Sequence, residues 1–209
     1  MNLFFDIETI PPDESLREVV FELAKKKAAN SEQAERGKPQ TKESIWRQTA
    51  LSGDFGRIFC IGYALGDGNV DIICGEEKEI IKEWWEVADR ADLFIGHNIM
   101  DFDLNFIFKR SIIHKIKPSA KHLNLSFARY KNYPIFDTMM EWNKWSFRAA
   151  ISLDKLAKVL GLPTSKDGGI DGSKVYDAYS DGKHDEIYEY CKRDVELTRQ
   201  VYKRMTFGD

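Results

Sequence analysis

Short apolar runs alternate with amphipathic helical patterns along the chain, and this alternation constrains the fold more than any other feature. Runs rich in aromatic and β-branched residues predict strands at residues 2–7, 57–65, 69–74, 92–98 and 133–139. Apolar positions at helical spacing predict helices at residues 13–30, 76–90, 102–113, 152–162 and 185–205. The "GDG" at residues 66–68 predicts a hairpin between the second and third strands. Together these elements predict an α/β fold with a mixed β-sheet flanked by helices.

The length of 209 residues and a hydrophobic fraction of 43% predict one domain, residues 1–209, with a sizeable core. Residues 13–52 form a helical and loop insertion after the first strand. Within this insertion, residues 31–44 are polar and contain Gly37 and Pro39, which predicts a loop.

Composition also excludes several classes of protein. No apolar run approaches the roughly 20 residues that a membrane-spanning helix needs. The opening "MNLFFDIET" carries two carboxylates and no basic segment, which does not fit a signal peptide. The three cysteines are far apart and form no CxxC pair, so neither a disulfide framework nor a zinc site is expected. We therefore expect a reduced, cytoplasmic protein without a membrane partner.

The first candidate for chemistry is the pair of carboxylates in "FFDIET". Asp6 and Glu8 are two residues apart at the end of a predicted strand, so their side chains leave the same face of the sheet. Carboxylates that close repel each other, and a hard divalent cation such as Mg²⁺ or Mn²⁺ relieves the repulsion. The alternative is a solvated strand end.

Two further motifs carry acidic residues. In "GHNIMDFDLNF", Asp101 and Asp103 fall at the start of a predicted helix, where a carboxylate can also serve as an ordinary N-terminal cap. Near the end of the chain, Tyr190 and Asp194 are four residues apart and share one face of a helix. The alternative interpretation of this pair is a tyrosine on the helix surface beside a solvated acid.

Taken together, "FDIET", the second-motif pattern N-x-x-x-[FY]-D and Y-x-x-x-D resemble the three exonuclease motifs of the DEDD superfamily, tyrosine subtype. The resemblance is greatest to the group related to the proofreading domain of family-B DNA polymerases. It extends through "FDTMMEWNKW", "SLDKLAKVLGLP", "DGSKVYD" and "YCKRDVELT", and is least at residues 13–52. It implies a ribonuclease H-like fold and 3′–5′ exonuclease activity. Glu189 stands where the histidine subtype has its catalytic residue, which favours the tyrosine subtype.

The resemblance also implies roles for five residues. Asp6, Glu8, Asp103 and Asp194 match the four carboxylates that hold two Mg²⁺ or Mn²⁺ ions. Tyr190 matches the tyrosine that acts on the attacking water. Because a phenol with a pKa near 10 is a weak base, we expect it to orient the water by a hydrogen bond and not to abstract its proton.

Other residues of these motifs have less defined roles. Asn98 and Phe102 belong to the second motif and are candidate substrate contacts. Asp101 is not required by the pattern and stands as an alternative ligand or a cap.

A basic segment lies directly after the second motif. Residues 104–136 contain no acid and carry seven Lys or Arg residues, a local charge of +7 against −10 for the remainder. Aromatic residues are interleaved with these cations, a composition typical of single-strand binding. We therefore expect Lys109 and Arg110 to contact substrate, and Lys166 in the glycine-rich "SKDGGIDGSK" is a further candidate. The alternative is a solvated helix face and a plain surface loop.

These features predict a metal-dependent 3′–5′ exonuclease that binds nucleic acid and releases 5′-mononucleotides from a single-stranded 3′ end. DNA is favoured over RNA because of the family-B resemblance. The alternatives are an enzyme that trims RNA or short oligonucleotides, and a catalytically silent nucleic-acid-binding module on the same fold. The sequence identifies no protein partner.

Overall fold

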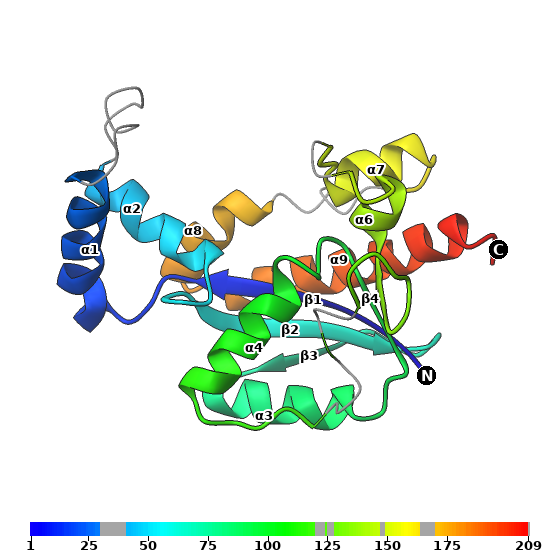
Figure 1. Ribbon diagram of the computed structural model, residues 1–209, viewed down its shortest axis with the longest axis horizontal. Helices are drawn as coiled ribbons and strands as arrows, with labels where there is room; N and C mark the ends of the chain where they lie inside the picture. Colours follow the sequence, from blue (N-terminus) through cyan, green and yellow to red (C-terminus); the bar gives the residue numbers. More distant parts are fainter. Residues whose placement is uncertain (30–40, 120–123, 125–127, 147–148, 164–169, 209) are drawn as a thin grey trace.

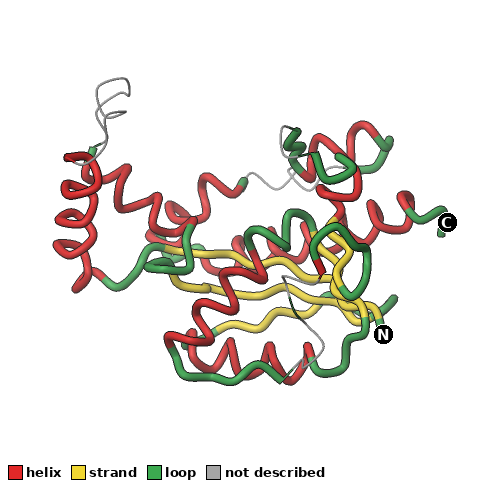
Figure 2. The backbone as a smooth tube through the Cα atoms, in the orientation of Figure 1, coloured by secondary structure: helices red, strands yellow, loops and turns green. Residues whose placement is uncertain are grey.

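The computed structural model describes the chain except for residues 30–40, 120–123, 125–127, 147–148, 164–169 and 209. Five strands form one sheet in the order β3-β2-β1-β4-β5 (Figures 1 and 2). The strands are β1 (Asn2–Ile10), β2 (Arg57–Leu65), β3 (Asp71–Cys74), β4 (Leu93–Gly96) and β5 (Ile135–Asp137). β1 is antiparallel to β2 and parallel to β4, so the predicted mixed sheet is confirmed.

Helices cover both faces of this sheet. On one face lie α3 (Glu77–Ala88) and α4 (Asp103–Ile113), which bury Trp84 and Ile107 against Phe5 of β1. On the other lies α9 (His184–Met205), which packs Val195 against Phe4 and Ala64. The alternation of β1 explains this arrangement, because Phe4 and Phe5 point to opposite faces and both are buried.

The remaining helices lie at the two ends of the sheet (Figure 1). Beyond the carboxyl end of β1 lie η1 (Glu14–Leu16), α1 (Arg17–Ala29), α2 (Lys42–Gln48), η3 (Thr49–Leu51) and α8 (Val175–Ser180). Near the carboxyl-terminal half of α9 lie α6 (Thr138–Trp142) and α7 (Leu153–Val159). η5 (Gly172–Lys174) leads directly into α8.

The structure changes some predicted boundaries. The polar segment predicted as a loop gives way at Lys42 to α2, because Thr41 caps that helix and Trp46 is buried beneath Arg17. The predicted helix at residues 13–30 begins as a 3-10 turn capped by Asp13. Within the described residues, every helix is too short or too polar to cross a membrane.

Candidate active site

Asp6 and Glu8 lie on the face of β1 that α9 covers. In the sheet they stand opposite Gly62 and Cys60 of β2, and a β-bulge follows immediately between Glu8 and Thr9. Ligand atoms of Asp6, Glu8 and Cys191 lie within 4.8 Å of one another. Strand alternation therefore places the two carboxylates side by side, as the spacing of two predicts.

Asp103 reaches the same place from the first turn of α4. β1 pairs with β4 only from Asn2 to Phe4. Farther along β1, the amide of Ile7 donates a hydrogen bond to Asp103 Oδ1 at 3.0 Å. The Asp103 side chain is almost fully buried. Burial raises the pKa of Asp103 from 3.8 to about 7, although the hydrogen bond from Ile7 opposes this rise. One side chain thus both fixes the strand between Asp6 and Glu8 and adds a third carboxylate.

Tyr190 and Asp194 come from α9, one helical turn apart, and both are buried. The helix can lie this close because β2 has a glycine beneath it. A Cβ atom at Gly62 would stand 2.9 Å from Cys191 Sγ and 3.1 Å from Val195 Cγ2. Since Gly62 is paired with Asp6, the close approach brings the helix directly over the carboxylates of β1.

The electrostatics show that these groups act on one another. Burial raises the pKa of Asp6, and the charges of Asp103, Glu8 and Asp194 raise it further. Burial likewise raises the pKa of Glu8, with contributions from Cys60, Asp194 and Asp103.

Within the described residues, Asp6, Glu8 and Asp103 form no ion pair with Lys or Arg. Their repulsion is therefore not offset by a side-chain cation. Oxygen ligands of this kind, converging without a protein counter-charge, fit hard divalent cations.

The thiol of Cys191 also touches this group, and its neighbours argue against a role as a metal ligand. Cys191 Sγ lies 3.5 Å from the Asp6 carbonyl oxygen and 3.8 Å from Asp6 Oδ2. The hydrogen bond with Cys60 and burial raise the pKa of Cys191 well above its ordinary value. Hard cations such as Mg²⁺ and Mn²⁺ prefer carboxylate oxygen to sulfur. Cys191 therefore packs between helix and strand, and the chemistry falls to the oxygens.

The phenol of Tyr190 is held neutral as well. Burial raises its pKa, and the charges of Asp194, Glu8 and Asp6 add to the effect. The hydroxyl also faces η5, because a Cβ atom at Gly172 would stand 4.0 Å from it. Tyr190 can thus donate a hydrogen bond but cannot serve as a base near neutral pH.

Two clefts are lined by residues of this group. One, of about 350 Å³, is lined by residues that include Glu8, Leu51, Phe102 and Tyr176. The other, of about 390 Å³, is lined by residues that include Tyr190, Asp194 and the start of α7 at Ser152–Asp154. Gly172 and Ser173 of η5 line both clefts. The two clefts therefore adjoin at η5, one beside Glu8 and the other beside Tyr190 and Asp194.

A buried aspartate that sequence reasoning did not single out supports the second motif. Asp137, at the end of β5, accepts from the amides of Asn98 and Met100 at 3.0 Å. It also accepts from the amides of Met139 and Met140 at the start of α6. Asn98 has a φ of 64°, so this left-handed turn is held by the Asp137 carboxylate. An acid between an apolar run and a helix, as in "IFDTMM", is the sequence signal that could have identified it.

The predicted substrate contacts have different outcomes. Phe102 lines the 350 Å³ cleft, and Asn98 lies in the turn before α4. Lys109 forms an ion pair with Asp54 at 2.8 Å. Lys166 lies outside the described residues.

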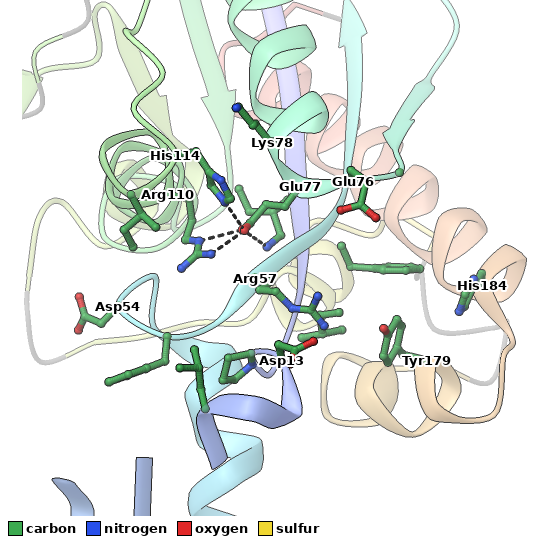
Figure 3. Close-up of a pocket in the computed structure, with 18 of the residues that line it drawn as sticks. Asp13, Asp54, Arg57, Glu76, Glu77, Lys78, Arg110, His114, Tyr179 and His184 are labelled. Atoms are coloured by element: carbon green, nitrogen blue, oxygen red, sulfur yellow. Dashed lines mark hydrogen bonds and ion pairs between the residues drawn. The ribbon is translucent and has the colours of Figure 1, made fainter. Parts of the chain in front are cut away.

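Two further charged residues of this region are paired. Arg110 is buried and holds Glu77 with two hydrogen bonds of 2.8 and 2.6 Å, and His114 binds the same carboxylate (Figure 3). A carboxylate buried at the start of α3 needs such a counter-charge, so the guanidinium is directed to Glu77 and away from the carboxylate cluster. Asp101 is exposed and forms an ion pair with Arg129 at 2.7 Å.

Comparison with known proteins places this geometry in context. A family described as a predicted 3′-5′ exonuclease related to the exonuclease domain of PolB matches residues 68–208, more than half of the chain. That range contains Asp103, Tyr190 and Asp194, while Asp6 and Glu8 lie before it. A search of curated proteins finds no match.

The fold also resembles a solved structure. The family B DNA polymerase from the hyperthermophilic archaeon Pyrobaculum calidifontis is similar with a TM-score of 0.64 and 17% sequence identity. The similarity covers 98% of this chain and 24% of the polymerase, so the chain spans about a quarter of that protein. The fold agrees with the ribonuclease H-like prediction. The chain belongs to the family of predicted 3′–5′ exonucleases related to the exonuclease domain of PolB.

Proposed function

We propose that the protein is a metal-dependent 3′–5′ exonuclease that hydrolyses phosphodiester bonds at the 3′ end of single-stranded DNA and releases 5′-mononucleotides. The observation that carries the proposal is the convergence of four carboxylates and one tyrosine from β1, α4 and α9. These elements are far apart in the sequence, and a solvated strand end or helix cap would not bring their acids together.

The residues present fit a pair of divalent cations. Asp6, Glu8, Asp103 and Asp194 would hold two Mg²⁺ or Mn²⁺ ions, and the charges of the other three acids all act on Asp6. Such ions activate water and neutralise charge on a phosphodiester undergoing displacement. Hydrolysis otherwise requires an anionic nucleophile to approach an anionic centre inside a cluster of acids.

Other residues of the chain bind and orient. Tyr190 remains a phenol and donates a hydrogen bond that fixes the attacking water, while Asp194 one turn later completes the acidic cluster. Gly172 offers backbone without a side chain beside the Tyr190 hydroxyl, which leaves space for a phosphate. The two clefts that meet at η5 would take the nucleotides on either side of the scissile bond.

The test is degradation of 5′-labelled DNA and RNA oligomers in Mg²⁺ or Mn²⁺, with Asp6→Asn as the matched variant. We expect a ladder that shortens from the 3′ end, is stronger on single-stranded DNA, and disappears in the variant and in EDTA. Stronger degradation of RNA would shift the substrate to the alternative enzyme class. Strand binding without degradation in either metal would support the catalytically silent alternative and refute the proposal.

A further inference from the structure

The three cysteines of the chain are far apart in the sequence but close together in the fold, and all three thiols are free. Cys60 of β2 stands directly opposite Cys74 of β3 in the antiparallel register. Directly opposed residues point to the same face of a sheet, with Cα atoms about 4.5–5.5 Å apart. Disulfides span Cα distances of about 4.4–6.8 Å, so the spacing of this pair permits a bridge.

The two opposed thiols differ in their surroundings. Cys74 is exposed on β3, an edge strand of the sheet, whereas Cys60 is fully buried against α9. Burial and a hydrogen bond with the Cys74 thiol raise the pKa of Tyr188 to about 12. The phenol therefore stays protonated and donates to the sulfur, which favours the thiolate that peroxides attack. Cys74 is thus the thiol that an oxidant reaches first.

Cys60 connects this edge of the sheet to the carboxylate cluster. Its thiol shares a hydrogen bond with the Cys191 thiol of α9, and Cys191 Sγ lies 3.8 Å from Asp6 Oδ2. Cys60 is also the partner of Glu8 in the pairing of β1 with β2. A bond from Cys60 to Cys74 would direct the Cys60 sulfur toward the edge strand and weaken its contact with Cys191. The packing of α9 against the carboxylates of β1 would change as a result.

We propose that Cys74 and Cys60 form a reversible disulfide when the protein meets hydrogen peroxide, and that this bond lowers the affinity of the carboxylate cluster for divalent cations. The proposal rests on the proposed function, because the metal site assigned there is the site that the disulfide regulates. Cys74 is the modified residue and Cys60 is its partner. Together they form a redox switch at the edge of the sheet.

The oxidation proceeds in two balanced steps. Peroxide first transfers one oxygen atom to the Cys74 sulfur, so that the O–O bond breaks, a sulfenic acid forms and water leaves. The Cys60 sulfur then attacks the Cys74 sulfur and the S–S bond forms. The sulfenic oxygen leaves with the Cys60 proton as a second water. Each thiol gives up one electron, and peroxide takes up both.

The first measurement locates the bond by peptide mapping. Trypsin cleaves after lysine and arginine, so Cys60 and Cys74 fall together in peptide 58–78. Cys191 falls in a separate peptide, 184–192. When the folded protein is treated with peroxide, then unfolded and alkylated, peptide 58–78 should have lost two hydrogens and should carry no alkyl group, while peptide 184–192 is alkylated. A bond that joins two peptides, or an alkylated Cys60, would overturn the proposal.

The second measurement tests the effect on the metal site. Calorimetric titration should show about tenfold weaker Mn²⁺ binding by the oxidised wild type than by the reduced protein, as for loss of a group that supports a metal ligand. Dithiothreitol should restore the affinity. Cys74→Ser is the matched control, because it removes only the exposed thiol, and its Mn²⁺ affinity should be the same before and after peroxide.

The outcomes separate this switch from the proposed function. Unchanged Mn²⁺ affinity in the oxidised wild type, or an equal loss in Cys74→Ser, would overturn the switch and leave the metal site standing. A missing disulfide would do the same. Reduced wild type that binds no Mn²⁺ would refute the proposed metal site, and the switch with it.

Discussion

Replacing Asp103 with asparagine should change how the stability of the metal-free protein depends on pH. The pKa of Asp103 is raised from 3.8 to about 7 by burial, so the folded state holds this proton more tightly than the unfolded chain does. The resulting stabilisation is complete below the unfolded pKa and is lost as pH rises through the folded one. Between about pH 5 and pH 8 the wild type should lose about 2.5 kcal/mol of unfolding free energy through this group.

The asparagine side chain in the Asp103→Asn variant carries no titrating proton and keeps an oxygen for the Ile7 amide. In urea unfolding with EDTA, the unfolding free energy of this variant should therefore decline less as pH rises. Its stability relative to the wild type should increase over the same range. Asp101→Asn, at an exposed position two residues earlier, is the control and should follow the wild type. The reasoning would be refuted if the unfolding free energies of wild type and Asp103→Asn changed in parallel with pH. It would also be refuted if the wild type became more stable relative to the variant as pH rises.

Three further substitutions separate the roles assigned above. Tyr190→Phe should lower kcat by about 10- to 100-fold while calorimetric Mn²⁺ affinity stays unchanged, because the role proposed for the phenol is to orient water and not to hold metal; a matching loss of metal affinity would contradict this. Arg110→Met should destabilise folding by about 3–5 kcal/mol in urea, because buried Glu77 would lose its guanidinium partner and keep only His114 beside it, and should leave the salt dependence of DNA binding unchanged. Gly62→Ala should lower both stability and activity, since its Cβ would stand 2.9 Å from Cys191 Sγ; a fully active variant would show that the close approach of α9 is not needed.

Much of the fold was predictable because local sequence patterns mark its strands. β2 matches its predicted range, Arg57–Leu65, since it is a long apolar run with a clear turn after it. The short helices α2 and α8 were not predicted, because tertiary contacts stabilise them. The hydrogen bond from Trp46 to Tyr176 and the ion pair from Arg47 to Asp177 join two segments far apart in sequence.

The candidate site was likewise predictable only where it depends on local spacing in the sequence. The shared face of Asp6 and Glu8 follows from strand alternation, and the shared face of Tyr190 and Asp194 from helical spacing. Pairing partners do not follow from spacing, so the basic segment gave no sign that Arg110 would be held by Glu77. The same holds for Asp137, which is identified by the hydrogen bonds that it accepts from the amides of Asn98 and Met100.

The central claim is that acids from β1, α4 and α9 form one divalent-metal site, and calorimetric titration with Mn²⁺ tests it most directly. Asp6→Asn and Asp194→Asn change residues on different elements, β1 and α9, at distant points in the sequence. If the site is shared, the wild type binds Mn²⁺ and each single variant loses at least about tenfold in affinity. Unchanged Mn²⁺ binding in Asp194→Asn, with thermal melting showing an intact fold, would contradict the account.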